Sequence, residues 1–202
     1  MRYLPLLHEV DQWQRDAAGR NPGVIPCHSG CSACCLGPFD ISIADAATLV
    51  EGFAQLPEPE REDIQRRAAS QLARVAELEP GWTAPYDVSA LGEERFDRLT
   101  EALHDVPCPV LDHAGRCRLY DHRPLVCRIM GLGMRTPARR VIDNDCPIRE
   151  DFPAYAALPP QPFDLEEWED REELALETAA GNAGASGAVG FETIIAAAIS
   201  TG

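Results

Sequence analysis

Eight cysteines, grouped in two segments of the chain, constrain the fold more than any other feature. Four of them lie within nine residues, in the stretch CHSGCSACC at 27–35, and the other four lie between residues 108 and 146. The 72 residues from 36 to 107 contain no cysteine. Because a random scatter would not leave such a gap, we expect the fold to bring two cysteine-bearing half-sites together.

The redox state of these thiols depends on where the protein resides. The first ten residues include Arg2, but their apolar run is broken by Pro5 and stopped by His8 and Glu9, which is not typical of an export signal. We therefore expect a cytoplasmic protein, in which thiols stay reduced and clustered cysteines bind metal more often than they form disulfides. Disulfides and inert buried thiols are the alternatives.

Composition narrows the classes of partner. The chain of 202 residues is long enough to bury a hydrophobic core, and its formal net charge is -15. This charge disfavours binding to nucleic acid or to anionic membranes, because both require clustered basic residues. The most apolar stretch, Ile194–Ile199, is far shorter than the roughly 20 residues of a membrane helix. We expect no nucleic acid and no membrane among the partners.

Apolar residues at three- and four-residue intervals predict that most of the regular structure is helical. The predicted helices are Leu6–Ala18, Ile43–Ala54, Glu60–Leu78, Gly92–His104 and an acidic helix that begins near Asp164. Ser42 followed by Asp45 resembles a capping box. Shorter elements follow Pro107, namely extended pieces at Pro109–Leu111, Cys117–Tyr120 and Arg139–Ile142 and a short helix from Pro124 to Gly131. The prediction is a mainly α fold, a small helical domain with an irregular, cysteine-lined metal core and a few short strands.

We expect the chain to divide into three parts. The predicted parts are an N-terminal helix and approach loop at residues 1–26, and a cysteine-cluster metal-binding domain at residues 27–150 with a helical insertion at 42–104. A Pro-rich connector, the acidic helix and a Gly/Ala-rich tail are expected at residues 151–202. Acids occupy seven of the ten positions from 164 to 173, which is typical of a solvated helix face, and contact with a basic protein partner is the alternative.

The spacing within the first group of cysteines is typical of thiolate metal ligands. In Cys27-x3-Cys31-x2-Cys34, three thiolates can converge on one centre, either a tetrahedral zinc ion or an iron-sulfur cluster. Neighbouring cysteines rarely bind one ion together, so Cys34 and Cys35 favour different centres or one polynuclear cluster. Eight thiols would complete two four-thiolate sites, and their pairing stays open. Radical S-adenosylmethionine enzymes use the same spacing, but the chain lacks their alternating strands and helices.

Both groups of cysteines resemble a known family. The matching residues are Cys27-x3-Cys31-x2-Cys34-Cys35, then Cys108-Pro109-Val110-Leu111, and then the run CRLYDHRPLVCR at 117–128. They are similar to the YkgJ-type cysteine-cluster family, also described as the putative zinc- or iron-chelating CxxCxxCC domain, over roughly residues 27–147. The first gap holds three residues where the family name implies two.

The resemblance implies a ligand set and a range of functions. The implied metal ligands are Cys27, Cys31, Cys34, Cys35, Cys108, Cys117 and Cys127, with Cys146 as a later and less fixed cysteine. A flagellin lysine methylase shares the cysteine cluster. The function implied is therefore metal binding or, as the alternative, a metal-cluster enzyme or electron-transfer accessory in protein or peptide modification. The residues do not decide whether the protein is an enzyme.

The remaining expectations concern the metal and its surroundings. Adjacent Cys34 and Cys35 and nearly pure thiolate ligation suit a cluster or a polynuclear centre, while closed four-thiolate sites equally suit structural zinc. An iron-sulfur cluster and zinc therefore both stay open for the eight cysteines. Arg123 and Arg128 lie in the matching motif, and we expect their guanidinium groups to donate to sulfur and to offset the thiolate charge. His28 and His122 are candidates for additional zinc ligands.

Overall fold

The structure is a computed structural model that describes residues 3–182 and 190–201, and it is mainly α, as predicted. Its α-helices are α1 (Tyr3–Arg20), α2 (Ile43–Ala54), α3 (Glu58–Leu78), α4 (Val88–Leu91), α5 (Glu93–Ala102), α6 (Leu125–Ile129), α7 (Pro153–Ala156), α8 (Leu165–Asn182) and α9 (Ile195–Thr201). Its strands are β1 (Asp40–Ser42), β2 (Met134–Arg135), β3 (Val141–Ile142), β4 (Gln161–Pro162) and β5 (Glu192–Ile194). Part of the predicted Gly/Ala-rich tail, residues 183–189, lies outside the described residues.

The helix boundaries follow from local signals in the sequence. Ser42 caps α2, since its Oγ accepts a hydrogen bond from the backbone N of Asp45 at 3.1 Å. Helix α3 begins at Glu58, two residues before the predicted start. Pro59 fits in its first turn because backbone N–H groups there have no partner within the helix, so a residue without an N–H loses no hydrogen bond. The short helix predicted after Pro124 is α6.

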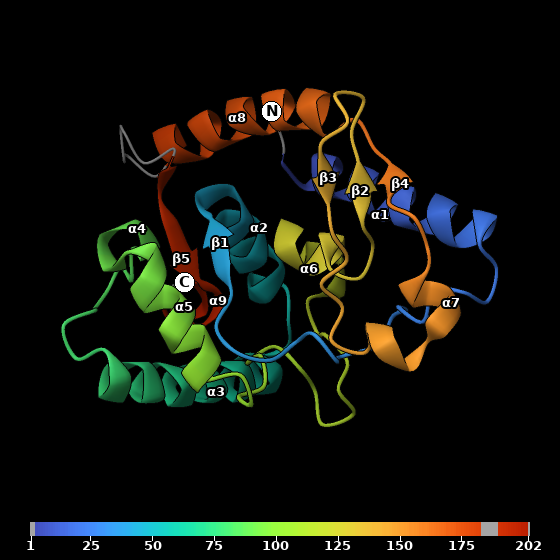
Figure 1. Cartoon of the computed structure of the whole chain (residues 1–202). Helices are drawn as coiled ribbons and strands as arrows, with labels where there is room; N and C mark the ends of the chain where they lie inside the picture. Colours follow the sequence, from blue (N-terminus) through green and yellow to red (C-terminus); the bar gives the residue numbers. More distant parts are fainter. Residues whose placement is uncertain (1–2, 183–189, 202) are drawn as a thin grey trace.

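The C-terminal end of the chain returns into the centre of the molecule. Strand β5 pairs antiparallel with β1, with Asp40 opposite Ile194, and α9 packs against α3 and α2. Figure 1 shows α2 and α9 between α3 on one side and α8 on the other. A second small sheet has the order β3-β2-β4, with β2 antiparallel to β3 and parallel to β4.

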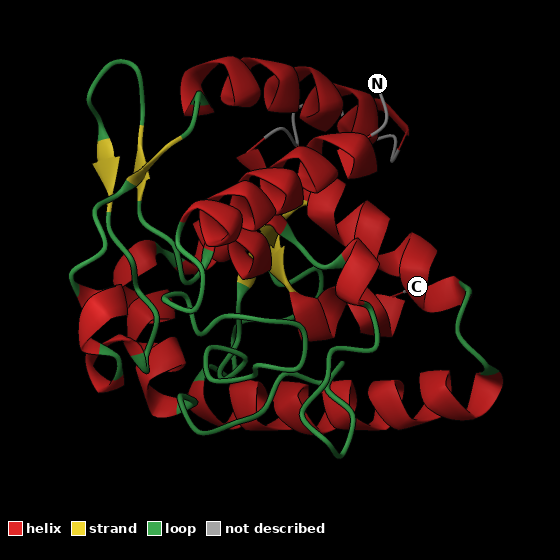
Figure 2. Ribbon diagram, turned by 90° about the vertical axis from the view of Figure 1, so that its right-hand side faces the viewer, coloured by secondary structure: helices red, strands yellow, loops and turns green. Residues whose placement is uncertain are grey.

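Two hydrophobic cores meet at α6. One core is built around α2, α3, α5 and α9, and the other around α1, α8 and β2. Within α6, Val126 and Cys127 pack against the first core, and Leu125 and Ile129 pack against the second. Long loops cross the region between the helices (Figure 2). The cysteine-bearing loops therefore lie beside a helix that both cores hold in place.

The close approach of α2 to the second group of cysteines gives a testable expectation. Gly52 of α2 faces His122, and a Cβ added at Gly52 would lie 2.7 Å from the Cβ of His122. We expect Gly52→Ala to lower the free energy of unfolding by about 1–3 kcal/mol, because the extra methyl overpacks the site. Urea unfolding of Gly52→Ala and of the double variant Gly52→Ala/His122→Gly tests this cause, since removing the whole His122 side chain, Cβ included, should leave the double variant about as stable as His122→Gly alone.

The matched control for this substitution is Gly19→Ala in α1. A Cβ at Gly19 would meet nothing within 4 Å, so this variant should be neutral or slightly more stable. Equal losses in the two alanine variants would contradict the overpacking explanation.

In the part of the chain that the structure describes, no helix combines the length and the hydrophobicity needed to cross a membrane.

Candidate metal centre

Backbone hydrogen bonds join the first cysteine segment (residues 27–35) to the second cysteine segment (residues 108–146). The backbone N of Cys108 donates to the carbonyl O of Cys35 at 2.9 Å, and the N of Gly37 donates to the O of Val106 at 2.7 Å. Leu36 and Pro107 form an antiparallel bridge between these two bonds. The helical stretch between the segments therefore closes a loop that brings both groups of cysteines together.

Seven of the eight cysteines line one cavity, which we call the cysteine cavity. These seven are Cys27, Cys31, Cys34, Cys35, Cys108, Cys117 and Cys127. The cavity encloses about 70 Å³. A single water needs roughly 10–15 Å³, so the space suits a metal ion with further ligands or a compact cluster.

The local structure of the second cysteine segment places Cys108, Cys117 and Cys127 at this cavity. A tight turn at Asp112 returns the chain, since Asp112 Oδ1 accepts from the backbone N of Ala114 and of Arg116, each at 2.8 Å. This turn pairs Leu111 with Cys117 in an isolated bridge. The start of α6, which carries Cys127, is fixed by Asp45 of α2, whose Oδ1 accepts from the backbone N of Leu125 at 2.9 Å.

The thiols surround the cavity, but their sulfur atoms are not arranged as a complete set of metal ligands. All eight cysteines are free thiols. Among the described residues, no group of three or more His, Cys, Asp or Glu side chains is arranged to hold a metal ion as it stands. Each thiol can swing about its Cα–Cβ bond, so the common cavity, and not the present sulfur positions, identifies the candidate centre.

Burial and mutual proximity disfavour the ionised form of several of these thiols. Cys27 is exposed at the surface, but partial burial of its side chain, followed by the charges that Cys31, Cys34 and Cys146 would carry, raises its pKa to about 11. Burial also raises the pKa of Cys108 to about 12, and raises that of Cys127 well above the usual value. A hydrogen bond with Cys35 and then burial raise the pKa of Cys34. A cation placed among the thiols would reverse these shifts, so the donor set fits a thiolate-bound metal.

Cys146 lies at one edge of the arrangement and does not line the cysteine cavity. Its backbone N donates to Asn144 Oδ1 at 3.0 Å, and its thiol interacts with the hydroxyl of Tyr155. That hydroxyl also donates to the carbonyl O of Gly131. A Cβ added at Gly131 would lie 3.2 Å from the Tyr155 hydroxyl and 3.5 Å from Cys27 Sγ, so the surroundings of Cys146 border on Cys27.

Arg123 and Arg128 are held by one carboxylate, that of Asp11 in α1. Arg123 Nη2 donates to Asp11 Oδ1 at 2.6 Å, and Arg128 Nη1 pairs with Asp11 Oδ2. Arg128 is completely buried, and it also donates to the carbonyl O of Arg123 at 2.8 Å and of Asp121 at 2.7 Å. Arg123 lines the cysteine cavity, with its guanidinium 3.8 Å above the Tyr120 ring. Donation from either arginine to sulfur stays a prediction.

The two histidines differ in position. His28 lines the cysteine cavity, and its Nδ1 lies 2.9 Å from the carbonyl O of Ser29. His122 packs against Gly52 and does not line the cavity. Gln14 of α1 and Tyr120, which is 37% exposed, also line the cavity. No motif in the sequence distinguishes Gln14 from the other polar residues of α1.

Comparison with known proteins adds one match. The model of a family described as "CxxCxxCC: Putative zinc- or iron-chelating domain" matches residues 26–147, which include all eight cysteines. Neither a curated protein nor a solved structure matches the chain.

Proposed function

Because the chain belongs to the CxxCxxCC family, whose domain is described as zinc- or iron-chelating, we propose that it is a metal-binding protein with a polynuclear thiolate centre in the cysteine cavity. The cysteines from both segments are the ligands. Cys146, at the edge, is an eighth ligand that joins when the centre forms.

The observation that carries this proposal is the convergence of seven cysteines on a single cavity. A zinc ion takes four thiolates, so seven thiols around one space exceed what one ion can use. Adjacent residues Cys34 and Cys35 both line the cavity, which suits two metal ions or a cluster better than one ion. A reducing compartment such as the cytosol keeps such thiols available for metal.

Arg123 and Arg128 support the centre from one side. Their positive charges favour the ionised form of Cys117, although burial dominates and leaves the pKa of that thiol raised. Through Asp11 they also tie two segments to α1, the loop before α6 that carries Arg123 and α6 itself, which carries Cys127 and Arg128. We propose that they stabilise the thiolate-rich centre by charge and by position.

Metal analysis of protein purified without air, with a spectrum before and after dithionite, tests this proposal. Iron with acid-labile sulfide and absorption near about 400 nm that bleaches on reduction would identify an iron-sulfur cluster. A colourless protein with more than one zinc per chain would identify a zinc-thiolate centre, since zinc has no redox chemistry. A folded protein that holds neither metal would contradict the proposal.

A second function, catalysis or electron transfer in the modification of a protein or peptide, has one observation in its favour. Cys27 and His28 are exposed, so the cysteine cavity can be reached from one side. A redox-active centre accessible at this edge would suit such a role. Reduction by dithionite together with a spectral change on addition of an exogenous thiol would support it, because the first shows a redox-active centre and the second shows an iron that an external ligand can reach.

A further inference from the structure

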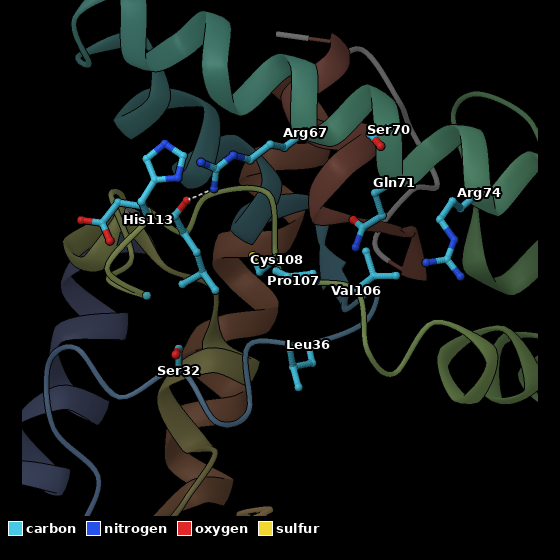
Figure 3. Close-up of a pocket in the computed structure, with 13 residues that line it drawn as sticks. Ser32, Leu36, Arg67, Ser70, Gln71, Arg74, Val106, Pro107, Cys108 and His113 are labelled. Atoms are coloured by element: carbon cyan, nitrogen blue, oxygen red, sulfur yellow. Dashed lines mark hydrogen bonds between the residues drawn. The ribbon is translucent and has the colours of Figure 1, made fainter.

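A groove lies beside the cysteine cavity, between α3 and the Leu36–Pro107 bridge at which the two cysteine segments meet (Figure 3). Its volume is about 610 Å³. Its lining includes Arg67, Gln71 and Arg74 on α3 and Leu36, Pro107 and Cys108 opposite them. We propose that this groove, the α3 groove, binds an organic anion: a carboxylate or phosphate group carried on an apolar body of small-molecule size.

Helix α3 supplies the polar wall. Arg67, Gln71 and Arg74 follow one another at four- and three-residue intervals, so they share one face of the helix. Figure 3 shows Gln71 and Arg74 projecting from α3 toward Val106 and Pro107. Ser70, which is exposed, adds a hydroxyl donor on the same side.

Arg74 has donors available for a ligand. Within the described residues it makes one long ion pair, 3.9 Å from its Nη1 to Asp105 Oδ1, and its side chain is 47% exposed. A guanidinium group carries five N–H donors in a planar fork that matches a carboxylate or a phosphate. Arg74 is therefore the residue that captures the anionic group.

The charge around the groove is positive although the whole chain is acidic. Near one end, the carboxylate of Asp63 pairs with three arginines, Arg66, Arg67 and Arg118, so positive charge is in excess there. Asp112 also lines the groove, but its Oδ2 pairs with Arg116 Nε at 3.0 Å. In a protein of net charge -15, this local excess draws an anion to the groove.

The opposite wall is apolar. Leu36 is 42% exposed, and it lines the groove with Val106, Pro107 and Leu111. A ligand that pairs with Arg74 can bury an apolar body against these side chains. The volume falls within the roughly 300–1,000 Å³ of small-molecule sites, which is why we infer a small organic anion.

The groove and the cysteine cavity share a wall. Cys108 and Leu111 line both, and Arg67 Nη1 donates to the carbonyl O of Leu111. An anion in the groove would thus lie against the loop that carries Cys108. The inference rests on the lining of the groove and does not depend on the proposed metal or on its identity.

The test uses the full chain as purified, with any metal it holds, titrated by calorimetry and by amide NMR. The probes are 3-phenylpropionate and phenyl phosphate, with neutral 3-phenylpropionamide and inorganic phosphate as comparisons. We expect at least one aromatic anion to bind and to shift amide signals of α3 and of residues 106–111. The anion that binds more tightly shows whether the groove prefers a carboxylate or a phosphate. The neutral amide and inorganic phosphate should each bind about tenfold more weakly than that anion.

Variants on α3 locate the site. Arg74→Gln should weaken binding of the preferred probe by about ten- to hundredfold, because it removes a charge-assisted hydrogen bond. Ser70→Glu, at an exposed position beside Arg74, should weaken it similarly by repelling the anion. Arg61→Gln is the matched control, since Arg61 is on the same helix, pairs with Glu58 and does not line the groove.

Three results would overturn the proposal. The first is binding of the neutral amide as tight as that of the carboxylate. The second is an equal loss in Arg61→Gln and Arg74→Gln. The third is no saturable binding of either anion up to about 10 mM, a concentration at which even weak specific sites fill.

Discussion

Replacing Asp11 by alanine is expected to lower the free energy of unfolding by about 3–5 kcal/mol, the cost of leaving a buried charge without its partner. Arg128 has no exposed side-chain surface, and Asp11 pairs with both Arg128 and Arg123. The carbonyl groups that also accept from Arg128 do not neutralise its charge. Urea unfolding of the variant and of the unchanged protein measures the loss.

The control for this substitution lies on the same helix. Asp16 is exposed, and its carboxylate accepts from the side chain of Gln12. Asp16→Ala should change stability by less than about 0.5 kcal/mol, as surface substitutions usually do. A similar small change in Asp11→Ala would mean that the two buried arginines do not depend on this carboxylate.

The second large effect concerns the thiols themselves. Cys34→Ser should lose most of the bound metal. Its free energy of unfolding should fall by about 4 kcal/mol as a result, because this is what a bound ligand contributes when it is present at about a thousand times its Kd. The reason is that Cys34 lines the cysteine cavity. It also lies close enough to Cys27, Cys108 and Cys127 for its ionisation to raise the pKa of each of these thiols. Metal content and thermal unfolding, measured on the same samples, should fall together.

Ser32→Ala is the matched control for this variant. Ser32 lies between two of the cysteines, and it fixes the local turn through its backbone O, which accepts from the N of Cys35 at 3.0 Å and survives the substitution. It should keep its metal and its melting temperature. A Cys34→Ser protein with unchanged metal would remove Cys34 from the ligand set.

The features that the sequence predicted correctly are local ones. The N-cap of α2 depends on Ser42 and Asp45, which are three residues apart, and the start of α6 follows directly after Pro124. Helix α3 shows a regular apolar face in sequence, with Ile64, Ala68 and Val75 buried. Such signals need no knowledge of the rest of the fold.

Long-range partners could not be predicted in this way. Asp11 lies 117 residues from Arg128, and nothing near Asp11 distinguishes it from the other acids of α1. The sequence therefore assigned the two arginines to sulfur, whereas their strongest contacts in the structure go to a carboxylate and to backbone oxygens. Whether they also act on the thiols depends on the metal-bound state.

The end of the chain and the α3 groove were missed for a different reason. The apolar stretch Ile194–Ile199 is too short for its periodicity to separate strand from helix, and it supplies the end of β5 and most of α9. The polar face of α3 resembles any solvated face, because only the opposing loop with Leu36 and Pro107 makes it one wall of a groove. Both features depend on which segments the fold places opposite each other.

The most direct test of the central claim is the position of the metal. Crystals of the metal-loaded protein, measured at the iron and zinc absorption edges, would locate it by anomalous scattering. We expect the metal inside the cysteine cavity, bound by sulfur atoms from both the first and the second cysteine segment, with more than one metal ion in the centre. Metal bound outside the cavity, or by the cysteines of one segment alone, would contradict the account.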